Sequence, residues 1–147
     1  MTVVRRADVV WTGDLISGYG VVSASTSNAF ASLPVTWASR TEAADGRTSP
    51  EELIAAAHAS CFSMALSASL SRAGTPPRRL EVTAEVAFGQ VAGSWRVASS
   101  ALKVRGWVPG IDSVSFQRMA EGAKEGCPVS QALKGNVELS VEATLES

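Results

Sequence analysis

The chain has 147 residues, a formal net charge of -1 at pH 7 and 46% hydrophobic residues. This length predicts a single domain over residues 1–147, and the near-neutral charge argues against a surface that binds nucleic acid or an anionic membrane. We expect no membrane span, because the apolar residues are spread along the chain. Residues 1–8 contain no apolar signal segment, which favours the cytoplasm.

Three short strands are predicted in the first forty residues. Residues 3–11 mix β-branched and charged side chains, and residues 12–14 form a turn that ends this strand. The second and third strands are predicted over residues 18–23 and 33–37. A polar loop over residues 40–48 follows them.

The clearest helix signal begins at Ser49. Ser49 is predicted as the N-cap and Pro50 as the first helical residue, and Glu52 completes a capping box. Residues 53–73 contain neither proline nor glycine, and Gly74 ends the helix. Because nearly every side of this helix is apolar or small, we expect it to be buried on all faces.

The second half of the chain predicts strands around a second helix. Residues 80–88 alternate apolar and polar side chains, and residues 101–106 are the most regular part of the next strand. A helix over residues 112–126 is interrupted at Cys127, and residues 136–145 alternate again. This order of elements predicts an α+β domain with a largely antiparallel sheet.

Two cysteines and one histidine are the candidate chemical groups. Cys61 lies in the middle of the predicted central helix, where it can simply be a buried small side chain. Cys127 precedes a proline where a helix starts, and helix N-termini lower the pKa of a thiol. His58 shares a helix face with Cys61, so a cysteine hydrolase is a weaker alternative. No third group that would orient His58 is evident, which favours a structural or interface role for it.

No metal or organic cofactor is predicted. Two cysteines and one histidine without close ligand spacing do not build a closed zinc site. The sequence contains no C-x-x-C motif, and its Gly18-Tyr19-Gly20 segment lacks the further glycine of a phosphate-binding loop.

Residues 49–66 resemble the central helix of the osmotically inducible protein C (OsmC) and organic hydroperoxide resistance (Ohr) proteins. The resemblance continues through residues 108–112 and 123–133, and the turn at residues 11–14 also fits it. It spans nearly the whole chain, with both cysteine motifs in register. The segment over residues 124–130, Lys-Glu-Gly-Cys-Pro-Val-Ser, is more similar to the OsmC branch.

This resemblance implies an intertwined homodimer and a thiol-dependent peroxidase. Cys61 is implied to be the peroxidatic thiolate that reduces organic hydroperoxides to alcohols, and Cys127 the resolving thiol that forms a Cys61–Cys127 disulfide. An external dithiol, such as a lipoyl-type reductant, would restore both thiols. The alternative is a non-enzymatic module that binds a small molecule or an acyl chain on the same fold, with inert cysteines.

The resemblance also implies an arginine and a glutamate that activate the peroxidatic cysteine. Glu51 matches the glutamate, and Arg40 is the best match to the arginine, with Arg47 as a second candidate in the same loop. A guanidinium held by a carboxylate is suited to stabilise a nearby thiolate.

Glu51 and Cys61 are ten positions apart on one predicted helix. Their backbones are therefore about 15 Å apart along its axis. We expect an arginine held by Glu51 to act on Cys61 of the partner chain in a two-fold dimer.

Overall fold

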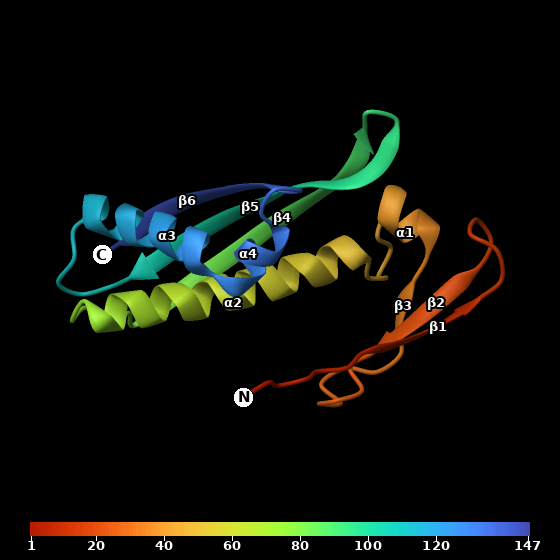
Figure 1. The fold of residues 1–147 in the computed structure, drawn as a ribbon, viewed down its shortest axis with the longest axis horizontal. Coiled ribbons are helices and arrows are strands. Elements are labelled where there is room, and N and C mark those ends of the chain that lie inside the picture. The colour runs from red at the N-terminus through yellow and green to blue at the C-terminus, as the bar shows by residue number, and fades with distance from the viewer. The chain divides into compact units, whose positions relative to one another are not determined.

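The computed structural model describes residues 1–147 and divides the chain into two compact units, residues 1–53 and residues 54–147 (Figure 1). The elements follow the order β1-β2-β3-α1-α2-β4-β5-α3-α4-β6, with two three-stranded sheets. The predicted α+β class is confirmed. The single domain over residues 1–147 stays a prediction.

The first unit contains the antiparallel sheet β1-β2-β3, formed by β1 (Asp8–Thr12), β2 (Tyr19–Ser23) and β3 (Leu33–Val35). All three predicted strands are present. The first begins at Asp8 rather than at residue 3, and the third ends at Val35 rather than at residue 37.

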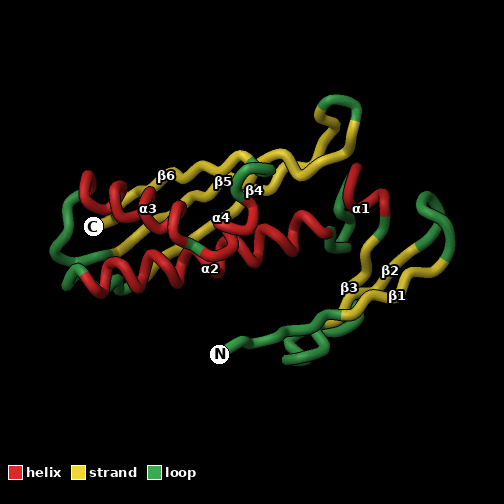
Figure 2. The backbone as a smooth tube through the Cα atoms, in the orientation of Figure 1, coloured by secondary structure: helices red, strands yellow, loops and turns green.

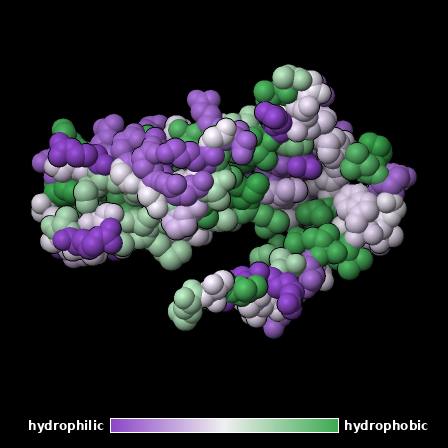
Figure 3. All heavy atoms as spheres, viewed as in Figure 1, coloured by the Kyte–Doolittle hydropathy of each residue, from purple (hydrophilic) through white to green (hydrophobic).

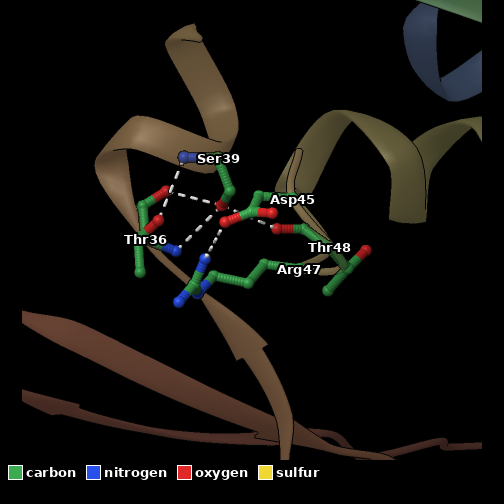
Figure 4. Close-up of polar contacts among 5 residues, drawn as sticks. All are labelled: Thr36, Ser39, Asp45, Arg47 and Thr48. Atoms are coloured by element: carbon green, nitrogen blue, oxygen red, sulfur yellow. Dashed lines mark hydrogen bonds and ion pairs between the residues drawn. The ribbon is translucent and has the colours of Figure 1, made fainter. Parts of the chain in front are cut away.

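A short helix, α1 (Trp37–Thr41), begins where a strand end and a polar loop were predicted. Its cause is a capping box, drawn in Figure 4: the Ser39 N–H donates to Thr36 Oγ1, and the Thr36 N–H donates to Ser39 Oγ, each at 3.0 Å. The Ser39 hydroxyl also lies 3.1 Å from the carbonyl oxygen of Thr48. This contact joins α1 to the end of the loop that leads from α1 to α2.

The long helix α2 (Pro50–Arg72) starts and ends close to its predicted limits. The Glu52 N–H donates to Ser49 Oγ at 3.1 Å, which is the expected cap. The second half of the predicted capping box is replaced, because the Glu52 carboxylate accepts from the Thr48 hydroxyl at 2.7 Å.

Only one face of α2 is buried within the chain, so the expectation of burial on all faces is not met. His58, Phe62, Leu66 and Leu70 are fully buried, whereas the row Ala56, Ser60, Met64 and Ala68 is exposed. By length and hydropathy α2 is also able to cross a membrane, which corrects the expectation that no segment qualifies. Core helices pass the same test, and α2 supplies Phe62, Leu66 and Leu70 to the core.

In the second unit, β5 (Ser94–Trp107) is the central strand (Figure 2). It pairs antiparallel with β4 (Arg79–Val91) and parallel with β6 (Glu138–Glu146). The parallel pair arises because the helices α3 (Ser113–Gly126) and α4 (Pro128–Leu133) carry the chain back between β5 and β6. Three of the four strand pairs are antiparallel, which agrees with the predicted largely antiparallel sheet.

The core of the second unit lies between the helices and one face of this sheet. Along β5, the buried Leu102 and Val104 alternate with the exposed Lys103 and Arg105. Gly106 lets α3 approach closely, since an added Cβ would lie 2.7 Å from Cε1 of the Phe116 ring. The same core includes Cys127.

Candidate active site

The two cysteines meet in the second unit as free thiols. Cys61 lies on α2 and is partly exposed, whereas Cys127 is fully buried. Cys127 is both the C-cap of α3 and the N-cap of α4, and Pro128 takes the first position of α4. The predicted interruption of the helix at Cys127 is therefore confirmed. It places Cys127, at the start of α4, within hydrogen-bonding reach of Cys61 on α2.

The two thiols have pKa values displaced in opposite directions. Burial raises the pKa of Cys61, the hydrogen bond with Cys127 raises it further, and the N–H of Val129 only partly opposes them. Burial also acts to raise the pKa of Cys127, but hydrogen bonds from Cys61, Ser130 and Val129 outweigh it and lower the pKa. Within this unit, negative charge is therefore favoured on Cys127. A positive charge near Cys61 would act against these effects and lower its pKa.

A guanidinium–carboxylate pair forms in the first unit. Arg40, in the last turn of α1, donates from Nε at 3.0 Å and from an Nη at 2.8 Å to Oε1 of Glu51. Glu51 is only 6% exposed, and the Arg40 guanidinium lies 5.9 Å from the centre of the Trp37 ring. A buried carboxylate thus holds the Arg40 fork in one orientation.

The second candidate, Arg47, has a different setting. Its guanidinium lies 3.3 Å from the carboxylate of Asp45, and the side chains of both residues are exposed (Figure 4). An exposed pair of this kind contributes little and is screened by salt. Of the two arginines, Arg40 is the one that the structure joins to Glu51.

An apolar cavity of about 370 Å³ lies beside Arg40 in the first unit. Figure 3 shows hydrophobic side chains gathered over the β1–β3 sheet on the side that faces the reader. Arg40 is the only charged residue in the cavity wall, which consists of Val9, Trp11, Leu15, Val22, Val35, Thr36, Trp37, Arg40, Pro50 and Leu53. The cavity is suited to the apolar part of a small molecule that carries one polar group.

His58 contacts two hydroxyl groups. Its Nδ1 lies 2.6 Å from Ser100 Oγ and its Nε2 lies 2.8 Å from Ser130 Oγ. Both ring nitrogens are therefore occupied, and the geometry of a cysteine–histidine hydrolase, in which the imidazole faces the nucleophile, is not formed. The chain has no cluster of three or more His, Cys, Asp or Glu side chains that could hold a metal ion.

Sequence reasoning missed several residues of this region. Trp11 and Trp37 in the cavity wall were not singled out, and neither were Ser100 and Ser130 beside His58. The two serines lie 42 and 72 positions from His58, so no local pattern joins them. The Thr36-x-x-Ser39 spacing was a usable signal for α1, and α1 is what places Trp37 and Arg40.

Comparisons with known proteins identify the family to which this chain belongs. A sequence model of the OsmC-like protein family matches residues 43–142. The chain is 42% identical over 142 residues to the peroxiredoxin OsmC of Escherichia coli (strain K12), covering 97% of this chain and 98% of that protein. It is 30% identical over 95 residues to the organic hydroperoxide resistance protein of Xanthomonas axonopodis pv. citri, covering 64% and 65% of the two chains.

Solved structures show the same fold. The organic hydroperoxide resistance protein OhrB of Bacillus subtilis matches with a TM-score of 0.71 at 23% identity, covering 95% of this chain and 98% of that one. An organic hydroperoxide resistance protein from Elizabethkingia anophelis matches with a TM-score of 0.72 at 24% identity, covering 99% and 100%. The chain belongs to the OsmC-like protein family. The predicted resemblance is confirmed, with higher identity to the OsmC relative than to the Ohr relative.

The burial of His58 predicts a pH dependence of stability. Burial lowers the pKa of His58 below its ordinary value of 6.5. As the pH falls through 6.5, the unfolded chain binds a proton that folded His58 resists, so the unfolded state is favoured. The free energy of unfolding, measured with urea, should therefore decrease between about pH 7 and about pH 5.

The matched variant is His58→Gln, since His58 is the only histidine in the chain. In this variant the decrease over the same pH interval should be lost or much reduced. An equal decrease in the variant and the natural chain would assign the effect to carboxyl groups instead.

Proposed function

We propose that this protein is a thiol-dependent peroxidase that reduces organic hydroperoxides to alcohols without a metal or organic cofactor. The observation that carries the proposal is the contact between two free thiols, one partly exposed on a core helix and one buried at a helix start. The relatives named as a peroxiredoxin and as an organic hydroperoxide resistance protein support it.

The proposed reaction begins at Cys61. Its thiolate attacks one oxygen of the hydroperoxide, so that an S–O bond forms, the O–O bond breaks and the leaving alkoxide takes a proton to become the alcohol. Cys127 then attacks the sulfur of the Cys61 sulfenic acid, forming an S–S bond and releasing the hydroxyl group as water. An external dithiol, such as a lipoyl-type compound, is oxidised as it reduces this disulfide.

The electrostatics of Cys61 require a cation that residues 54–147 do not supply. Burial and Cys127 both raise the pKa of Cys61, whereas a nearby guanidinium would lower it. We assign this role to Arg40, which Glu51 holds by two short hydrogen bonds. Arg47, paired with an exposed aspartate, is the weaker choice.

A homodimer in which Arg40 of one chain serves Cys61 of the other fits the geometry of α2. Glu51 and Cys61 lie ten residues apart on this single helix, about 15 Å along its axis. The exposed row of Ala56, Ser60, Met64 and Ala68 has small side chains apart from Met64, which is 67% exposed. Such a row permits close approach of a second copy, which would also complete the burial of α2.

The apolar cavity beside Arg40 favours alkyl or lipid-like hydroperoxides over hydrogen peroxide, because apolar walls add affinity only for an apolar group. The same cavity favours the alternative of a non-enzymatic acyl-chain binding module. The contact between the two thiols separates the alternatives, since a binding module has no use for it.

A catalytic cycle that passes through free thiols suits a reducing compartment, and we propose that the protein acts in the cytoplasm.

Substitution of the cysteines tests the sequence of steps. Cys61→Ser should abolish reduction of cumene hydroperoxide, because a serine hydroxyl is not ionised near neutral pH. Cys127→Ser should consume about one equivalent and stop at a sulfenic acid, which dimedone labels and mass spectrometry detects at Cys61. Sustained turnover of Cys127→Ser with a dithiol would contradict the resolving role, and turnover of Cys61→Ser would contradict the proposed function.

A matched pair of arginine variants tests the origin of the positive charge. Arg40→Ala should raise the pKa of Cys61 and slow its reaction with cumene hydroperoxide about tenfold or more, since one pKa unit is a tenfold change in thiolate. Arg47→Ala removes an exposed guanidinium from the same segment and should have little effect. Stopped-flow measurement at several pH values gives both quantities. The opposite ranking of the two variants would transfer the role to Arg47.

A further inference from the structure

Three buried polar side chains form a continuous line through the second unit. His58 lies between Ser100 of β5 and Ser130 of α4, with 2.6 Å between Nδ1 and Ser100 Oγ and 2.8 Å between Nε2 and Ser130 Oγ. All three residues are at most 1% exposed. A buried polar group without a hydrogen bond costs free energy. The two hydrogen bonds of His58 therefore hold these three side chains in a single arrangement.

The directions of the hydrogens follow from the partners. Ser100 Oγ has no hydrogen-bond partner other than His58, so its hydrogen is directed at Nδ1. Neutral His58 then carries its own hydrogen on Nε2 and donates it to Ser130 Oγ. Ser130 Oγ accepts this bond and keeps its own hydrogen free to donate elsewhere.

The sulfur of Cys127 is a possible acceptor for the Ser130 hydroxyl hydrogen. Cys127 is the N-cap of α4, and Ser130 is the third residue of that helix, the position that exchanges capping hydrogen bonds with an N-cap residue. After the opposing effect of burial and the contribution of Cys61, the backbone and hydroxyl of Ser130 are the next causes that lower the pKa of Cys127.

We propose that His58 is a positioning residue for Cys127, holding the Ser130 hydroxyl with its hydrogen turned toward the Cys127 sulfur. The role of Cys127 as the resolving thiol rests on the function proposed above, whereas the orientation of Ser130 does not. In that reaction His58 stays neutral, and the proton that Cys127 gives up ends in the water formed from the Cys61 hydroxyl. When a dithiol later opens the disulfide, the Ser130 hydroxyl stabilises the departing Cys127 thiolate.

Charged groups near Ser130 do not replace this hydroxyl. A small cavity of about 150 Å³ brings Lys124, Glu125 and Lys134 to the same place. Lys124 is paired with Glu121 at 3.0 Å and Glu125 at 3.5 Å, and Lys134 lies 3.7 Å from Glu125. None of these charges is among the causes that lower the pKa of Cys127.

The test is a direct titration of Cys127 by NMR of its labelled Cβ in a Cys61→Ser chain, which has a single thiol and no peroxide chemistry. Ser130→Ala and His58→Leu should each raise the pKa of Cys127 by about one unit. At any pH below the pKa, this shift leaves about tenfold less thiolate. The double variant should show no further increase, because both changes remove one interaction.

Two further variants supply the controls. His58→Gln retains an N–H that can donate to Ser130, so the pKa of Cys127 should stay close to its value in the Cys61→Ser chain. Ser71→Ala removes an exposed hydroxyl from the last turn of α2 and should leave the pKa unchanged. If His58→Leu does not fold, Ser100→Ala takes its place, since loss of the donor to Nδ1 should raise the pKa in the same direction by a smaller amount.

An unchanged pKa in Ser130→Ala, or full additivity of the His58→Leu and Ser130→Ala shifts, would overturn the proposal. With Cys61 restored, Ser130→Ala should slow formation of the disulfide by about the factor found in the titration. If the titrations behave as expected but peroxide never yields a Cys61–Cys127 disulfide, the peroxidase function fails and the positioning role of His58 stands.

Discussion

A cysteine attacks a peroxide as a thiolate, and the surroundings of Cys61 oppose that charge. Cys61 lies on a core helix, where burial and the neighbouring Cys127 both raise the pKa of its thiol. Cys127 is the N-cap of α4, and hydrogen bonds from Cys61 and from the first turn of α4 outweigh burial and lower the pKa of that thiol. Within residues 54–147 negative charge is therefore favoured on Cys127, and in the proposed reaction a cation from outside this unit stabilises the Cys61 thiolate.

In the proposed reaction the Arg40–Glu51 pair supplies this charge. A cation that acts on the partly exposed Cys61 thiol is most effective when it is fixed in place and partly desolvated. Both conditions hold for a guanidinium bonded to a carboxylate that is 6% exposed. The capping box of α1 fixes the backbone on one side of the pair, and the first turn of α2 fixes it on the other. In the same proposal, the apolar cavity beside Arg40 holds the apolar part of the hydroperoxide next to this cation.

Local chemistry allowed much of this arrangement to be predicted. Ser49 and Pro50 define the start of α2, and Pro128 defines the break at Cys127, because caps and prolines act within a few residues. The parallel pairing of β6 and the two serine partners of His58 depend on contacts between distant segments, which no local pattern encodes. The raised pKa of Cys61 likewise comes from tertiary burial.

The central claim is that Arg40 of one chain activates Cys61 of another, and subunit mixing tests it most directly. Cys61→Ser chains and Arg40→Ala chains are each expected to be nearly inactive as pure dimers. After exchange, a mixed dimer holds one site with an intact Cys61 from one chain and an intact Arg40 from the other. Peroxide reduction should then reappear in proportion to the mixed dimers, which mass spectrometry of the intact assemblies can count. Proven exchange without recovery of activity, or full activity in a monomer, would contradict the account.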